Sequence, residues 1–237
     1  MAGWNGNCTS EDVGNFFIKS FKYLLAGFLL AFIFSLKSFG AAAPAEVEGT
    51  VKADAVWSGR VLVVGDVLVP EGVTLRVAPG THISFIKSES SKIEPMFLSM
   101  GTELMVRGKL LVEGEKDRPV VFDAAPQDED GNTIKPGRGD WGGIIFDGRF
   151  AEGSVIRCAK ITMAETAVSM YDSSPSLESC TLADNKYGVI SMGGSRPRLA
   201  ACRVEGGEYG VLSGKGSGPV LADTKVKGNE KNFLTRE

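Results

Sequence analysis

The chain is poor in the residue types on which metal and nucleophilic chemistry most often depend. Its 237 residues include one histidine, His82, and four cysteines. A metal site built on imidazoles would lack a second His, and a Ser-His-Asp site would depend on this one side chain. In the alternating segment THISF, His82 is predicted to face solvent, and no G-x-S-x-G motif occurs. Both kinds of site are therefore disfavoured.

The chain also has no excess of positive charge. Lys and Arg number 26 and Asp and Glu number 29, which gives a formal net charge of −3. Without a basic excess to neutralise phosphates, nucleic acid is not an expected partner. Glycine is frequent, at 30 residues, but it follows no G-X-Y period. This composition predicts many turns rather than a collagen-like fold, and the length suits one domain or at most two.

No apolar stretch is long enough to cross a bilayer, which needs ~20 residues. The most apolar stretch, Tyr23 to Leu36, has 14 residues, follows Lys19 and Lys22, and precedes the small-residue stretch GAAAPA. This order is typical of a signal peptide with its cleavage site. We therefore predict a signal peptide over residues 1–45, with an uncleaved anchor as the alternative. The mature form is predicted to have no membrane span and to be exported to the periplasm, the extracellular space or the cell surface.

A 22-residue repeat runs through the C-terminal part of the chain. Five positions keep this interval. They are Cys158, Cys180 and Cys202; Pro175, Pro197 and Pro219; Leu177, Leu199 and Leu221; Leu182, Val204 and Val226; and Val189, Val211 and Phe233. A period of 20–50 residues indicates a solenoid.

The composition of the repeat favours coils of parallel β-strands over helices. Short apolar bursts alternate with Gly, Asn, Asp, Ser and Pro, and no segment keeps helical periodicity for two turns. Residues 22 apart should then lie ~4.8 Å apart along one axis, in columns of like side chains. We expect the three cysteines and the three leucines each to form one such column. The spacing of Leu177, Cys180 and Leu182 breaks parity, which predicts a one-residue bend between two sheets.

The first half follows the same pattern with a looser period. WSGRVLV, starting at Trp57, is similar to DWGGIIF, which starts at Asp140, and VTLRVAPGTHISF is similar to TELMVRGKLLVEG. Two polar insertions interrupt the pattern, at residues 87–100 and 124–140. We predict that both are loops displaced to the surface between coils, where added length has a small entropic cost.

The segments GDVLVPEGVTLRVAPGTHISF, LMVRGKLLVEGEKDRPVVFDAA and GDWGGIIFDG resemble the right-handed parallel β-helix repeat family, a pectin-lyase-like scaffold of bacterial envelope and secreted proteins. The resemblance covers about Val51 to Leu234. It implies an all-β fold, a single-domain right-handed parallel β-helix over residues 46–237. The scaffold hosts polysaccharide lyases, glycosidases and adhesins, so the resemblance does not define an activity.

One candidate cation site lies in the second insertion. Asp128, Asp130 and Asn132 alternate as oxygen ligands do in a calcium loop. However, Gly131 comes one residue early and no Glu follows at the twelfth position. An ordinary solvated loop is the favoured interpretation. We expect no cofactor, with calcium as the alternative.

A candidate sugar-binding group lies where the second insertion ends. Arg138, Asp140 and Trp141 combine two charges with an indole ring that could stack on the apolar face of a sugar. Asp140 and Arg138 are also the only catalytic candidates, and both are weak. A structural role is favoured for the tryptophan, because Trp57 repeats its W-x-G pattern without the charges.

The three repeat cysteines do not suit a shared metal. Cys158 and Cys202 would lie ~10 Å apart, too far for one zinc. Neighbouring thiols would have parallel Cα–Cβ bonds, which is a poor geometry for a disulfide. We favour a column of small, buried side chains.

The sequence therefore predicts a scaffold with a structural or binding role at the cell envelope, recognising carbohydrate or another envelope protein. A polysaccharide lyase or glycoside hydrolase is the alternative. End-to-end assembly through the open sheet edge is not favoured, because Glu230, Lys231, Arg236 and Glu237 place charge around that edge.

Overall fold

A computed structural model describes residues 43–87, 101–128 and 130–237. These residues form parallel strands joined by turns, with one short 3-10 helix, η2 (Arg149–Ala151). Among the described residues, no helix is long and apolar enough to cross a membrane. The predicted signal peptide lies outside the described residues up to residue 42, and the first strand begins at Ala45.

The chain winds around three strand ladders, here named faces A, B and C. Face A is a seven-stranded sheet. Its strands, in stacking order, are β2 (Ala55–Trp57), β4 (Thr74–Val77), β7 (Lys109–Glu113), β10 (Val155–Arg157), β13 (Ser176–Glu178), β16 (Arg198–Ala200) and β19 (Val220–Ala222).

Faces B and C belong to one 14-stranded sheet that folds at β3 (Arg60–Val69). Face B continues with β5 (His82–Lys87), β8 (Val120–Asp128), β11 (Ala159–Thr162), β14 (Thr181–Ala183), β17 (Arg203–Glu205) and β20 (Lys225–Val226). Face C continues with β6 (Glu103–Val106), β9 (Trp141–Asp147), β12 (Ala164–Tyr171), β15 (Tyr187–Met192), β18 (Tyr209–Ser213) and β21 (Lys231–Thr235). Strand β1 (Ala45–Thr50) pairs with both halves of β3.

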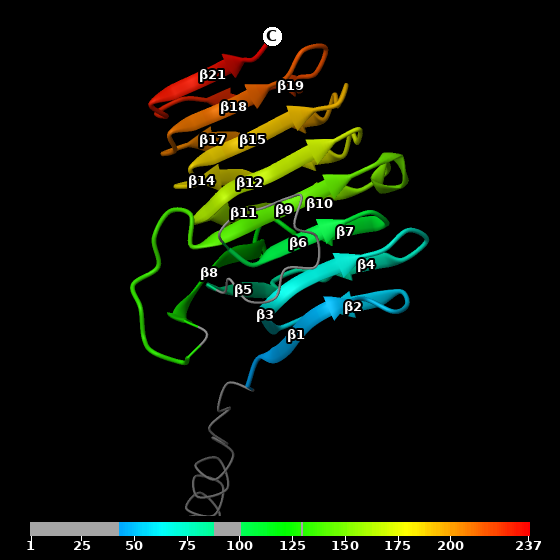
Figure 1. Cartoon of the computed structure of the whole chain (residues 1–237), viewed down its shortest axis with the longest axis vertical. Coiled ribbons are helices and arrows are strands. Elements are labelled where there is room, and N and C mark those ends of the chain that lie inside the picture. The colour runs from blue at the N-terminus through cyan, green and yellow to red at the C-terminus, as the bar shows by residue number, and fades with distance from the viewer. Residues whose placement is uncertain (1–42, 88–100, 129) are drawn as a thin grey trace, which may run out of the picture. The chain divides into compact units, whose positions relative to one another are not determined.

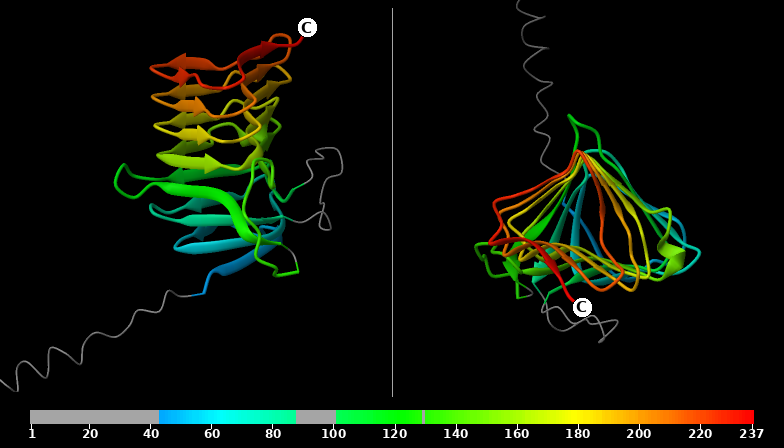
Figure 2. Two further views of the ribbon diagram at one scale, coloured as in Figure 1. Left: turned by 90° about the vertical axis from the view of Figure 1, so that its left-hand side faces the viewer. Right: turned by 90° about the horizontal axis from the view of Figure 1, so that it is seen from above.

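Residues 43–237 thus form a right-handed parallel β-helix with a three-sided cross-section (Figures 1 and 2). All strand pairs between coils are parallel, which agrees with the strong preference of such crossovers for the right hand. The predicted fold class is confirmed.

The 22-residue register holds through the last three coils. Leu177 pairs with Leu199, and Leu199 pairs with Leu221. Val189, Val211 and Phe233 form another column on face C. These two predicted columns are therefore present, and each points toward the core.

The predicted column of three cysteines is wrong by one residue. The coil that contains Cys158 is 21 residues long, because Ile156 pairs with Leu177. The turn at residues 172–175 is one residue shorter than the equivalent turn at residues 193–197. Cys158 therefore lies below Ser179, and only Cys180 and Cys202 share a column.

The predicted one-residue bend is present at the corner between faces A and B. Cys158, Ser179, Ala201 and Asp223 have φ angles of 45°, 55°, 53° and 49°. None of these four is glycine, so each coil bears a cost of ~1 kcal/mol for its left-handed residue. The bend lets Leu177 and Leu182 both face the core although five residues separate them.

Along the chain, both polar insertions come between a strand of face B and a strand of face C. Residues 88–100, outside the described residues, connect β5 to β6, and residues 129–140 connect β8 to β9. The second insertion starts later than predicted, because residues 124–128 continue strand β8. The similar segments around Trp57 and Trp141 are not equivalent in the fold, since these residues lie on faces A and C.

The core fills the interior along the whole axis. Its largest fully buried side chains include Phe85, Phe122, Trp141 and Phe146. The rings of Phe85 and Trp141 stack with centroids 4.0 Å apart. Burial of each such side chain contributes ~1.5–3 kcal/mol.

Candidate functional site

The outward side of face B carries a column of cationic side chains. In the strand register Arg60 is next to His82, and the same outward column continues through Val121, Lys160, Thr181, Arg203 and Lys225, of which three are cationic. Apart from His82, these residues form no ion pair with any described residue. Their ammonium and guanidinium groups remain available to a ligand, whereas two arginines of face A, Arg76 and Arg157, form ion pairs with Glu113 and Glu178 at 2.8 and 2.9 Å.

A groove of about 510 Å³ opens on the lower part of this face. Face B provides its floor through Arg60, His82, Ser84 and Asp123. The second insertion and the strand before it provide a wall that includes Gln127 and Pro136. The insertion therefore adds depth to a sheet face that would otherwise be flat.

Three polar side chains on the groove floor form one network. The imidazole Nε2 of His82 lies 2.8 Å from the Oδ2 atom of Asp123, and the hydroxyl of Ser84 donates to Oδ1 of the same carboxylate at 2.9 Å. The carboxylate is central, so the serine hydroxyl is not in contact with the imidazole. This order differs from a nucleophilic triad, in which His lies between Ser and Asp.

The geometry suits hydrogen bonding to a polyhydroxylated or anionic ligand. With Nε2 bonded to Asp123, the Nδ1 atom of His82 is left for a ligand. The His82 side chain is 47% exposed and the Asp123 side chain 28%. Sequence analysis correctly placed His82 at the solvent but missed its partner, because 41 residues separate His82 from Asp123.

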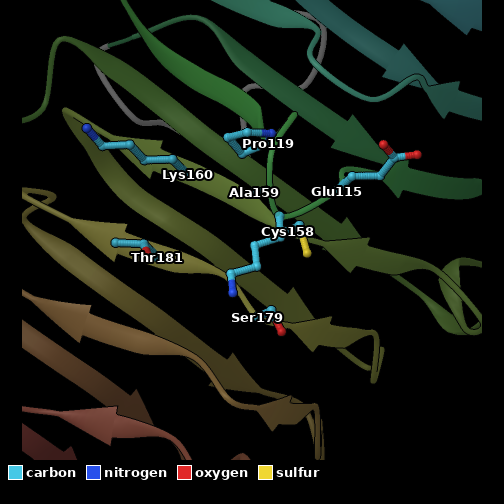
Figure 3. A pocket seen from close by; sticks show the side chains of 8 residues that line it. Glu115, Pro119, Cys158, Ala159, Lys160, Ser179 and Thr181 are labelled. Atoms are coloured by element: carbon cyan, nitrogen blue, oxygen red, sulfur yellow. The ribbon is translucent and has the colours of Figure 1, made fainter.

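A second cavity of about 460 Å³ opens at the other edge of face B. Figure 3 shows Cys158 in the middle of its lining, with Lys160 and Glu115 on either side. Thr181 and the turn residue Pro119 complete this part of the wall. Lys160 thus belongs both to this cavity and to the cationic column, which links the two hollows to one face.

Of the predicted sugar-binding residues, Arg138 and Asp140 lie at the surface corner and serve the insertion itself. The guanidinium of Arg138 donates to the Gly206 carbonyl at 2.7 Å. The carboxylate of Asp140 accepts a hydrogen bond from the Gly137 amide and lies 3.3 Å from the Lys87 ammonium. These contacts attach the loop to a higher coil at Gly206 and to the coil of Lys87 below, and they leave Asp140 only 16% exposed.

The structure does not bring Trp141 together with these charges in a binding site. Its side chain has no exposed surface, since it packs against Phe85 in the core. The indole Nε1 donates to the Thr162 carbonyl at 2.8 Å. The ring therefore offers no free face to a sugar, in line with the structural role favoured for it.

The calcium candidates are joined by hydrogen bonds within the loop. Oδ1 of Asp128 accepts from the amides of Asp130 and Asn132, and Oδ2 accepts from the Asn132 side chain. The bond from the Asn132 side chain is the largest cause of a lowered Asp128 pKa. Among the described residues, no group of three His, Cys, Asp or Glu side chains could hold a metal ion. Calcium binding stays a prediction here.

The paired thiols act as corner hydrogen-bond donors. Cys202 Sγ contacts the carbonyls of Ala200 and Leu177 at 3.3 and 3.5 Å, and Thr224 makes the equivalent contacts one coil above. The contact between the two thiols, together with burial, raises the pKa of Cys180, whereas the same contact lowers the pKa of Cys202 to about 7 against the opposing effect of burial. Their shared column explains why small polar residues recur there.

The winding, the three faces and the buried columns place the chain in the class of parallel β-helix proteins. No protein-family model, curated protein or solved structure matches the chain. Face B, with its two cavities and its cationic side chains, is the candidate functional site.

Proposed function

We propose that the protein is an exported envelope protein of the pectin-lyase-like type that binds glycans on face B. The observation that carries the proposal is the coincidence on one face of two cavities and four unpaired cationic side chains. A glycan needs hydrogen-bond donors and acceptors for its hydroxyls, and an acidic glycan also needs cations for its carboxylates. Face B offers both.

Each part of the groove has a role in this proposal. Asp123 and Ser84 contact ligand hydroxyls, Arg60 and Lys160 contact ligand carboxylates, and the wall around Pro136 restricts the approach. The His82–Asp123 contact keeps the imidazole in one orientation. Such preorganised polar groups lower the entropic cost of binding.

The proposal is tested by titrating the protein with neutral and acidic polysaccharides, with and without calcium, in a calorimeter. We expect acidic polysaccharides to bind. The double variant Asp123→Asn with His82→Ala should weaken binding at least about tenfold, because a loss of this size corresponds to one charge-assisted hydrogen bond. A matched control is Arg76→Ala with Glu113→Gln, which removes an ion pair of the same length from face A. Equal losses in both variants would contradict the proposal.

The alternative is a polysaccharide lyase or glycoside hydrolase on the same scaffold. One observation favours it: an imidazole held by a carboxylate, in a groove, can serve as a general base. Release of unsaturated or reducing ends by the protein, and its loss in His82→Ala, would establish the enzyme in place of the binding module. A hydrolase needs a second carboxylate ~5–10 Å from the first, and Asp123 is the only carboxylate in the described groove lining.

A further inference from the structure

The two ends of the stack carry most of the exposed apolar side chains. Among the described residues, five large hydrophobic side chains are exposed, and four of them lie on end strands: Val56, Val220, Leu221 and Phe233. Leu221 is 38% and Phe233 59% exposed, although both continue columns that are buried one coil below, at Leu199 and Val211. The core is therefore open at the C-terminal end.

The strand edges at the two ends are also unpaired within the described residues. At the C-terminal end these are β19, β20 and β21, and at the other end they are β1 and β2. Edges of this kind present free N–H and C=O groups to another chain. Because every pair in the stack is parallel, only a head-to-tail contact between two copies would continue the same ladder.

We propose that the C-terminal end of one copy stacks on the N-terminal end of a second copy. Extending the observed register by one coil places β19 on the partner copy's β2. It places β20 and β21 on the two halves of the partner copy's β1. The interface then has the geometry of any two neighbouring coils in the protein.

The apolar side chains at the two ends match column by column. Trp57 pairs with Val77, and that column continues upward to Leu221, so Leu221 meets Trp57 of the second copy. By the same register Val220 meets Val56. Leu221 becomes buried in this contact, whereas Val220 and Val56 contact each other on the outward side of face A, in the column of Arg76 and Arg198.

The exposed phenyl ring at the C-terminal end meets a glycine. Phe233 belongs to the column that contains Val67, and Val67 pairs with Gly49. A cavity of about 360 Å³ lies beside Gly49, lined also by Val47, Val51 and Trp57. The missing side chain at Gly49 thus leaves room for the phenyl ring of the second copy.

The charges of the two ends are complementary in the same register. Lys227 follows Val226, whose column contains Val61 and Ala45, so Lys227 lies over Glu46 of the second copy. With Phe233 over Gly49, Asn232 lies over Glu48 of the second copy, and Lys231 is the adjacent residue along β21. Charge at the C-terminal edge, which disfavours assembly when one end is considered alone, therefore attracts the opposite end and repels like ends.

A contact of this type uses two different surfaces and does not close on itself. Each added copy presents a new free end, so assembly grows into filaments rather than stopping at a dimer. The proposal predicts a molecular mass that rises steadily with concentration and falls with added salt, because exposed ion pairs are screened.

Charge reversal at each end tests the proposal on the purified protein as the cell produces it. Sedimentation analysis should show concentration-dependent oligomers for the wild type. Lys227→Glu with Lys231→Glu, and separately Glu46→Lys with Glu48→Lys, should each weaken self-association about tenfold or more. Mixing these two variants should restore it, because the reversed ends are again complementary. The uncharged change Phe233→Ser should weaken it as well.

The matched control is Lys109→Glu with Lys116→Glu, which reverses two exposed lysine charges on a coil in the middle of the stack. Circular dichroism and thermal unfolding verify that every variant is folded. A wild type that stays monomeric at all concentrations overturns the proposal. So does a mixture that stays as small as its components, or a control that dissociates as the end variants do.

Discussion

The two halves of this β-helix are built differently. The last three coils, from Ser176 to Thr235, repeat one register on all three faces. The first half keeps the same faces but adds two insertions at one corner and bulges in its strand pairs. The regular half offers flat faces, whereas the irregular half carries the groove with His82 and Asp123. The candidate site therefore lies in the half of the protein that departs from the regular repeat.

The largest difference should appear in the core. Phe85→Ala removes the ring that stacks on Trp141 in the irregular half, and we expect a loss of ~3–5 kcal/mol in the free energy of unfolding. Leu199→Ala, in the regular half, should cost ~2–5 kcal/mol, since the coils above and below supply the same contacts without an aromatic pair. Urea denaturation measures both. A smaller loss for Phe85→Ala would show that the insertions, and not the aromatic pair, hold this half together.

Two asparagines that form equivalent hydrogen bonds at different depths separate the effect of burial from that of hydrogen bonding. Asn185 accepts from the Ala164 amide and donates to the carbonyls of Ile161 and Ala183, and it is 2% exposed. Asn229 makes the equivalent set of bonds in the last coil, where it is only partly buried. We expect Asn185→Ala to cost ~1–3 kcal/mol and Asn229→Ala under ~1 kcal/mol. Equal losses in thermal unfolding would mean that the bonds matter independently of burial.

The smallest effect should come from the thiol column of the regular half. Cys202→Thr replaces a thiol with the hydroxyl that Thr224 and Thr81 already use for the same corner contacts. The change in the free energy of unfolding should stay within ~1 kcal/mol. Cys202→Val, of similar size but without a donor, is the control and should cost more. A greater loss for Cys202→Thr than for Cys202→Val would contradict a hydrogen-bonding role for this column.

Sequence analysis predicted the fold because like residues stack on like residues. The columns of Leu177 and Val189 recur at a constant interval, so they reveal the register without a structure. It misplaced Cys158, because a turn shortened by one residue changes the register without changing the spacing of the cysteines. A one-residue change in a surface turn leaves little trace in composition.

The candidate site was harder to predict for a physical reason. Asp123 is adjacent to His82 only because β8 lies directly above β5, although the two residues are 41 positions apart in the sequence. The single histidine suggested no partner. Trp141 and Asp140 were conspicuous in the sequence, but one fills the core and the other fastens a loop. Unusual residues near an insertion therefore indicate where the scaffold changes, not which side chains meet a ligand.

The constant register of the last three coils has a consequence for how such a chain can change in length. A tandem duplication of the segment from Arg198 to Pro219 would add one whole coil. Each new side chain would then lie in a column of similar side chains. Loss of the same segment would shorten the spiral with no mismatch. The protein can therefore become longer or shorter by whole coils, while the groove in the irregular half is unchanged.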